Sequence, residues 1–334
     1  MQDLQLSYPK ISIVTPSFNQ GKYIEQTIQS VLTQNYPNLE YIIIDGGSTD
    51  ETVEIIKKYE QQLSYWVSEP DKGQTDAINK GFAKCTGEIF NWINSDDYYE
   101  QGTFEKLAKL FSDNANINVI SGKEWSFHDE NPKVKTLNVG SIIKKNVYET
   151  LRVGITDQPC TFFRKKKIDA FFPLAESLHY VMDRQLWWSY LLKYGQGQIL
   201  QTDEIFTWFR LHSQSKSIEQ QKYFEGETDL LRLSLFTQLY APLALEEELN
   251  ADQRHVLAIN WNIQIPHPTK ILAAFATYYG EQHFVKHNLA FTAKLMKHVR
   301  RWKGIGMNAK EWKLWIAACV IPLPITSLIK KLKK

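Results

Sequence analysis

The sequence predicts an α/β fold in which helices flank a mostly parallel sheet, followed by a helical C-terminal extension. Two observations support this fold. Over residues 11–121, short apolar runs rich in β-branched residues alternate with amphipathic, helix-like stretches. From about residue 224 onward, helical patterns dominate. Strands that alternate with helices through short links are typical of parallel sheets whose crossover helices cover both faces.

Six short apolar runs have the composition of buried strands. The first two, ISIVT and YIII, are apolar and β-branched, and a residue that cannot continue a sheet, Pro16, follows the first. We expect strands at residues 11–15, 41–44, 65–67, 88–93, 119–121 and 161–163.

Amphipathic stretches between these runs predict the helices. The first has apolar residues at Ile24, Ile28 and Val31, which share one helix face. Ser48, with Glu51 three residues later, has the pattern of a capping box that would start the second helix. We expect helices at residues 22–34, 48–59, 75–83, 102–111 and 179–194.

The chain of 334 residues is long enough for two parts. A polar stretch, SQSKSIEQQK, separates them, so we expect an α/β domain at residues 1–220 and a helical region at 221–334. The three cysteines have no close spacing, which argues against a disulfide framework or a zinc site. The N-terminus has no apolar signal region. These features favour a reducing, cytoplasmic compartment.

The basic tail at residues 294–334 stands out against an acidic body. It carries 11 Lys and Arg and one acid, whereas the rest of the chain has 28 basic and 36 acidic residues. Its apolar run, LWIAACVIPLPITSLI, is too short for a membrane span and contains Pro322 and Pro324. We expect an interfacial anchor on an anionic membrane surface, at the inner face of the plasma membrane. The alternative is a helix that packs on the rest of the protein.

Polar loops follow four of the predicted strands. They are TPSFNQ, DGGSTD, SEPDKGQTDAIN and NSDD. Because the carboxyl ends of parallel strands share one edge of a sheet, these loops should build a single ligand pocket. Asp96 and Asp97 would repel each other there unless a cation joins them, and a hard divalent cation that also binds phosphate is the usual solution.

Two further residues at this edge have alternative interpretations. Asp45 follows a buried strand and could accept the N–H of a uracil or guanine base, or could serve as an acid at a helix N-terminus. Lys72 could meet a diphosphate as a point charge, or could be a solvated lysine.

These segments together resemble the inverting glycosyltransferases of family 2, which have the GT-A fold. The resemblance runs through residues 11–99, and resumes in QPCTFFRKKKID, ESLHYVMDRQLWWSYL and FRLHSQSKS. It implies an enzyme that moves a sugar from a nucleoside-diphosphate sugar, with UDP-sugar favoured, to a hydroxyl of a glycan or lipid-linked acceptor. It also implies Mg²⁺ or Mn²⁺ as cofactor.

The resemblance assigns roles to individual residues. The nucleotide-sugar site would contain Thr15, Pro16, Asn19, Asp45, Lys72, Asp76, Asn94 and Ser95. Asn94 replaces the first acid of the family's Asp-x-Asp element, so Asp96 becomes the main metal ligand. The metal site would also include Asp97, as a ligand or a supporting neighbour, and His212, which could instead be a structural hydrogen-bonding residue.

Asp183 matches the family's catalytic base. Inversion requires a carboxylate that takes the proton of the attacking hydroxyl as the new bond forms. The structural alternative is that Asp183 caps its own helix.

Other functions remain open at this point. A nucleotidyltransferase that acts on sugar phosphates also uses strand-end acids and a metal, but TPSFNQGK lacks the expected Gly-rich phosphate loop. A catalytically inactive module for glycan assembly is a further alternative. Nucleic-acid binding is disfavoured, because the basic residues cluster in the tail. The sequence does not identify the sugar, the acceptor or the linkage.

Overall fold

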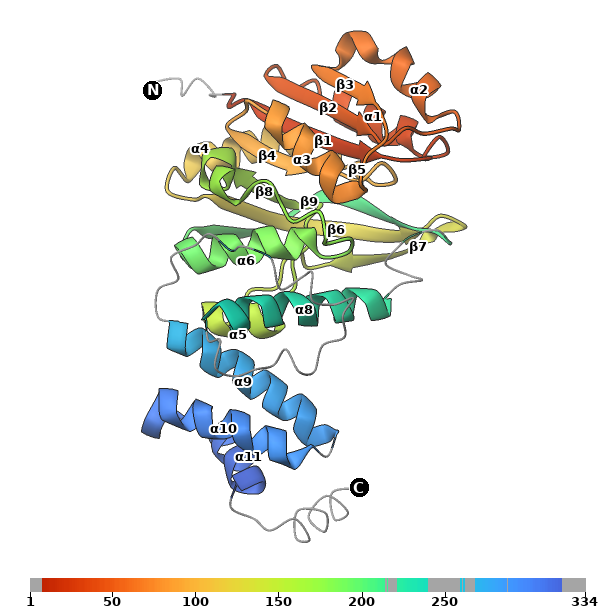
Figure 1. Cartoon of the computed structure of the whole chain (residues 1–334). Helices are drawn as coiled ribbons and strands as arrows, with labels where there is room; N and C mark the ends of the chain where they lie inside the picture. The colour runs from red at the N-terminus through yellow and green to blue at the C-terminus, as the bar shows by residue number, and fades with distance from the viewer. Residues whose placement is uncertain are drawn as a thin grey trace, which may run out of the picture.

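The computed structural model describes residues 8–213, 215, 221–239, 259, 261, 268–286 and 288–319. Within them, nine strands form one sheet in the order β3-β2-β1-β4-β8-β6-β9-β5, and β7 pairs with β6 (Figure 1). The strands are β1 (Ile11–Ser17), β2 (Leu39–Asp45), β3 (Tyr65–Ser68), β4 (Ile89–Trp92), β5 (Tyr98–Tyr99), β6 (Val119–His128), β7 (Asn131–Asn138), β8 (Thr161–Arg164) and β9 (Ile199–Leu211).

The first four strands of the sheet are parallel, as the alternation of strands and helices predicts. Beyond β4 the sheet becomes mixed, because β8 runs antiparallel to both β4 and β6, while β6 and β9 are parallel. The short β5 pairs antiparallel with β9, so the chain just after β4 is tied to the far edge of the sheet. The predicted α/β fold class is confirmed.

Helices cover both faces of this sheet (Figure 1). They are α1 (Ile24–Leu32), α2 (Thr52–Lys58), α3 (Gln74–Lys84), α4 (Thr103–Asp113), α5 (Val147–Val153), α6 (Met182–Tyr194), α8 (Gln221–Leu239), α9 (Pro268–Val285), α10 (Leu289–Lys303) and α11 (Ala309–Cys319). Short 3₁₀ turns lie at Glu60–Gln62, Lys165–Lys167, Asp169–Phe171 and Gly304–Gly306.

Alternation along the strands divides the core in two. In β2, Tyr41 and Ile43 belong to one apolar cluster with α1, α2 and α4, whereas Ile42 and Ile44 belong to a second cluster on the opposite face. Successive side chains of a strand point to opposite faces, so a strand buried on both sides contributes to two cores.

The second cluster continues without a break into the helical region. Trp188 of α6 stacks on Trp261 at 6.3 Å and lies 5.9 Å from the ring of Phe275 in α9. The same cluster includes Leu295 of α10 and Leu314 of α11. Helices α9, α10 and α11 therefore belong to the same continuous apolar cluster as one face of the sheet. Along the chain they lie successively farther from the sheet (Figure 1). The proposed boundary at residue 220 lies outside the described residues.

The capping box proposed for the second helix is wrong. The helix α2 begins at Thr52, with Glu51 at the N-cap position and no side-chain cap. The Ser48 hydroxyl and backbone N–H both donate to Asp45. The Ser48 oxygen accepts from the Asn19 backbone N–H at 2.7 Å, so the loops use the groups that a capping box would need.

Only part of the basic tail lies within the described residues. Trp312 and Trp315 of α11 pack against the second apolar cluster, and the Arg300 guanidinium lies 4.2 Å from the centre of the Trp315 ring. Residues 320–334 are outside the described part of the chain. Among the described residues, no helix has both the length and the apolar character needed to cross a bilayer.

Candidate active site

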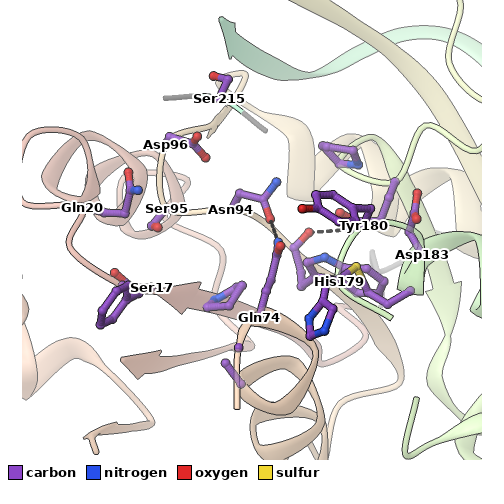
Figure 2. Close-up of a pocket in the computed structure, with 18 of the residues that line it drawn as sticks. Ser17, Gln20, Gln74, Asn94, Ser95, Asp96, His179, Tyr180, Asp183 and Ser215 are labelled. Carbon is purple, nitrogen blue, oxygen red and sulfur yellow. Dashed lines mark hydrogen bonds between the residues drawn. The ribbon is translucent and has the colours of Figure 1, made fainter. Parts of the chain in front are cut away.

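A cavity of about 820 Å³ opens at the carboxyl ends of β1, β2 and β4. This is the edge of an α/β sheet where ligands bind, and the volume is in the range of small-molecule sites. Its wall also includes the start of α3, the loop before β8 and the start of α6 (Figure 2). Five carboxylates contribute to the lining: Asp71, Asp96, Glu124, Asp157 and Asp183.

The loop after β2 is built around Asp45. This side chain is fully buried, and it accepts hydrogen bonds from the backbone N–H groups of Gly47 and Ser48 and from the hydroxyls of Ser48 and Ser68. Gly46, the next residue, lines the cavity. Asp45 therefore holds the loop in place beneath the cavity, with its carboxylate turned to the protein's own donors.

The loop after β1 contributes Pro16, Ser17, Phe18 and Gln20 to the lining. Of the other residues predicted here, Thr15 is fully buried and shares a hydrogen bond of 3.0 Å with the Tyr41 hydroxyl. Asn19 is exposed, with a φ of 51°, and its side-chain oxygen accepts from the Thr49 N–H at 2.9 Å. Thr15 and Asn19 thus connect the first two strands and their loops.

Lys72 and Asp76 organise the loop before α3. The Lys72 ammonium pairs with Glu176 at 2.8 Å, and its backbone N–H donates to the Asp76 carboxylate at 3.1 Å. Asp71 and Gly73 of the same loop line the cavity. Burial raises the pKa of the Asp71 carboxyl.

The four residues NSDD after β4 turn their side chains in different directions. Asn94 faces the cavity, where its side-chain oxygen accepts from the Gln74 amide at 2.7 Å (Figure 2). Asp96 also faces the cavity, and its Oδ2 lies 3.0 Å from Nε2 of His212. Asp97 is only 1% exposed and accepts from the Arg210 backbone N–H at 2.9 Å. Burial and the charge of Asp96 raise the pKa of Asp97 well above its usual range.

Arg210 of β9 holds this loop in place, a role that no sequence pattern indicated. Its Nε donates to the Asp96 carbonyl at 2.9 Å, and its guanidinium pairs with Asp129 at 2.6 Å. It also lies over the Tyr23 ring, 4.8 Å from its centre. The Arg210 guanidinium thus stabilises the turn that carries Asp96.

The donor set at Asp96 suits a divalent cation. One carboxylate oxygen and one imidazole nitrogen converge there, the Asp96 side chain is 22% exposed, and the Ser95 residue beside it also lines the cavity. Oxygen and nitrogen ligands of this kind fit Mg²⁺ or Mn²⁺. Asp97, predicted at the metal site as a ligand or a supporting neighbour, is directed toward Arg210 and Asn94.

Asp183 lies in the first turn of α6 and faces the cavity. In the view of Figure 2 it lies on the opposite side of the pocket from Asp96. Val181 occupies the N-cap position of α6 and its side chain forms no capping hydrogen bond, so Asp183 is not the N-cap residue of this helix. Burial raises the pKa of the Asp183 carboxyl, and the neighbouring Arg184 partly offsets that effect.

A residue of the helical region sets the start of α6. The carboxylate of Glu227 in α8 accepts from three consecutive backbone N–H groups, those of His179, Tyr180 and Val181, at 2.9, 2.7 and 2.9 Å. His179 and Tyr180 line the cavity next to Asp183. Neither periodicity nor a motif indicated Glu227, whereas His179 and Tyr180 lie in the segment ESLHYVMDRQLWWSYL but had no predicted role.

The mixed sheet with helices on both faces and a cavity at the carboxyl ends of its strands is an arrangement of the GT-A type. Residues 12–172 match the family model described as glycosyl transferase family 2. This part of the chain is therefore similar to the family 2 glycosyltransferases.

Several curated relatives share this domain. An uncharacterized glycosyltransferase, Rv1514c of Mycobacterium tuberculosis, is 39% identical over 94 residues, which is 28% of this chain and 36% of that protein. The putative teichuronic acid biosynthesis glycosyltransferase TuaG of Bacillus subtilis is 31% identical over 133 residues, 39% of this chain and 53% of TuaG. The uncharacterized glycosyltransferase RT0329 of Rickettsia typhi is 29% identical over 195 residues, 55% of this chain and 59% of that protein. The chain thus spans between about a third and three fifths of these relatives.

Among solved structures, TarS of S. aureus has a similar fold. Its residues 1–349 in complex with UDP superpose with a TM-score of 0.54 at 18% identity, covering 92% of this chain and 90% of that one. At this identity the likeness concerns the fold alone.

Proposed function

We propose that this protein is a metal-dependent, inverting glycosyltransferase that transfers a sugar from a nucleoside-diphosphate sugar to a hydroxyl acceptor. The observation that carries the proposal is that Asp96 and Asp183 face one cavity at the carboxyl edge of the sheet. A UDP-sugar is the favoured donor, which the UDP complex of the similarly folded TarS supports. The similarity to TuaG supports an acceptor in cell-surface glycan synthesis, either a glycan or a lipid-linked sugar.

The donor end of the cavity is formed by the loops after β1, β2 and β4. Pro16 and Gly46 bring backbone close to the ligand, while Asn94 and Ser95 offer hydrogen-bonding groups for hydroxyls or phosphate oxygens. Other predicted residues support the donor site indirectly, because their hydrogen bonds hold these strands and loops in place. They are Asp45, Thr15, Asn19, Lys72 and Asp76.

Asp96 and His212 would hold the Mg²⁺ or Mn²⁺ ion. Asp97 would stabilise the turn that carries Asp96 through its hydrogen bond from the Arg210 backbone N–H. When bound, such an ion offsets the negative charge that develops on the diphosphate. The need for it follows from the lining, since five carboxylates face the cavity and a diphosphate alone would add to that negative charge.

Asp183 acts as the general base in this scheme. The acceptor oxygen attacks the anomeric carbon from the face opposite the diphosphate, its proton passes to the Asp183 carboxylate, and the nucleoside diphosphate leaves with the bonding electron pair. A pKa raised by burial makes the carboxylate a better proton acceptor, provided that the pH keeps it ionised.

The test is ligand-dependent thermal stability. UDP with Mn²⁺ at about 100 times its Kd should raise the Tm of the wild type by roughly 3 to 8 °C. Asp96→Ala should lose the part of this increase that depends on Mn²⁺, whereas Asp113→Ala, which removes an exposed acid of α4, should keep it. A panel with GDP and CDP identifies the base.

Product analysis then separates the alternative functions. Transfer with inversion should release a nucleoside diphosphate and give a product of opposite anomeric configuration, which NMR coupling constants report. Release of inorganic diphosphate would instead identify a nucleotidyltransferase. A protein that binds nucleotide sugars without turnover in any acceptor mixture would fit the inactive assembly module.

A further inference from the structure

Glu124 enters the cavity because β6 is irregular at that point. Pairing between β6 and β9 shifts register between Ser121 and Lys123 and again between Lys123 and Glu124. Gly122 occupies this bulge, where a Cβ would overlap the Phe206 ring. A bulge changes which way the following side chains point, and here it places a carboxylate of a central strand in the cavity wall.

A second carboxylate meets Glu124 from the loop before β8. The Asp157 backbone is fixed at both ends, since its N–H donates to the Ser141 hydroxyl at 2.9 Å and its carbonyl accepts from the Thr161 hydroxyl at 2.5 Å. The nearest oxygens of the two carboxylates, together with the Cys160 sulfur, all lie within 4.8 Å of one another. Asp157 and Asp183 both line the cavity.

Glu124 has hydrogen-bonding capacity that the protein itself does not use. The residue is only 5% exposed, and its Oε1 accepts from the Asn138 amide at 2.9 Å. Its Oε2 is buried and, apart from the neighbouring Asp157 carboxyl, has no hydrogen-bond donor among the described residues. When Asp157 is ionised, this buried carboxylate oxygen is left unsatisfied, which is unfavourable. A ligand that donates to this atom removes the penalty.

The electrostatics of the pair favour one kind of ligand. Burial raises the pKa of both carboxyls, that of Asp157 to about 6, and the charge of Asp157 adds to the effect on Glu124. Two carboxyls this close retain a shared proton, so the pair both accepts and donates hydrogen bonds. A sugar hydroxyl does the same, whereas a carboxylate or phosphate on the ligand meets like charge from Asp183 as well.

We propose that Glu124 and Asp157 form the acceptor subsite, and that it takes an uncharged, hydroxyl-bearing sugar ring and rejects a ring that carries a carboxylate or phosphate. This inference rests on the proposed function for the role of Asp183 beside it. Glu124 and Asp157 are specificity residues in this scheme, and Asp183 remains the base.

The experiment measures sugar binding to the full chain without donor or metal. Saturation-transfer NMR and calorimetry would compare four methyl glycosides (glucoside, galactoside, mannoside and N-acetylglucosaminide) with the uronides of the first three. We expect at least one neutral glycoside to bind at least about tenfold more tightly than its uronide, because juxtaposed like charges weaken binding. Glu124→Gln and Asp157→Asn should each reduce this ratio to less than about threefold.

Glu130→Gln is the matched control, since it removes an exposed acid from the turn that follows β6. It should leave the ratio unchanged, and circular dichroism should show all three variants folded. Equal binding of glycosides and uronides by the wild type, no binding of any neutral glycoside, or an unchanged ratio in both Glu124→Gln and Asp157→Asn would overturn the inference.

Nucleotide binding separates this inference from the proposed function. If UDP with Mn²⁺ stabilises the protein but the sugar preference is absent, the acceptor subsite is wrong and the transferase proposal stands. If the preference depends on Glu124 but no nucleotide sugar binds, the subsite stands as a sugar-binding site and the transferase proposal fails.

Discussion

At the scale of single residues, Asp183 combines two properties that a general base needs. It faces the cavity, and it is partly buried in the described structure. Burial raises its pKa, so the ionised form is populated only above that raised value. Activity should therefore rise with pH as Asp183 loses its proton.

We predict that Asp183→Asn lowers kcat by about 10²- to 10⁴-fold, with the Kd of the nucleotide sugar unchanged. In the wild type, kcat/KM should rise with pH through the raised pKa, and the residual activity of Asp183→Asn should lack this step. Steady-state kinetics across a pH series measure both effects, with Asp113→Asn as an exposed acid control. A variant that keeps the same pH step would point to another base.

At the scale of elements, helix α8 holds in place the segment that precedes α6. Three N–H groups before α6 donate to one carboxylate, that of Glu227, and the residues that carry two of them line the cavity. The geometry at Asp183 thus depends on an element that begins after the predicted domain boundary. The family model ends at residue 172, well before it.

We predict that Glu227→Ala lowers the free energy of unfolding by about 1 to 3 kcal/mol, because it leaves buried N–H groups without an acceptor. It should also lower kcat more than it weakens nucleotide-sugar binding, since it disturbs the Asp183 end of the cavity. Urea denaturation and kinetics measure these effects. Glu225→Ala, an exposed acid of the same helix, should be neutral in both; equal losses for the two variants would show that α8 acts only through its general stability.

At the scale of the whole molecule, charge is distributed unevenly. The tail at residues 294–334 is strongly basic and the rest of the chain is acidic. Helices α10 and α11 use part of that tail for packing, as Arg300 does on Trp315, so this part belongs to the folded core. The lysines at the end of the chain remain as the candidates for contact with an anionic membrane, each contributing about 1 kcal/mol near such a surface.

We predict that the full chain floats with anionic phosphatidylglycerol vesicles and not with neutral phosphatidylcholine vesicles. Changing Lys330, Lys331, Lys333 and Lys334 to Glu should abolish flotation. The control changes four exposed lysines of the sheet domain to Glu: Lys57, Lys109, Lys133 and Lys145. Flotation that survives the tail substitutions, or that is lost equally in the control, would remove the membrane proposal.

The sequence by itself determined the local structure and the edge of the sheet where the polar loops meet. Strand and helix periodicities depend on near neighbours, and this is why the predicted strands and helices are found in the structure, although β1 continues through Pro16 to Ser17 and α2 begins only at Thr52. Pro16, Asn94, Ser95, Asp96 and Asp183 line one cavity. Only the tertiary structure decided which way each acid turns. Asp45 and Asp97 satisfy the protein's own donors, a register shift brings in Glu124, and α8 supplies Glu227. Those outcomes depend on packing between segments far apart in the chain, which no local pattern encodes.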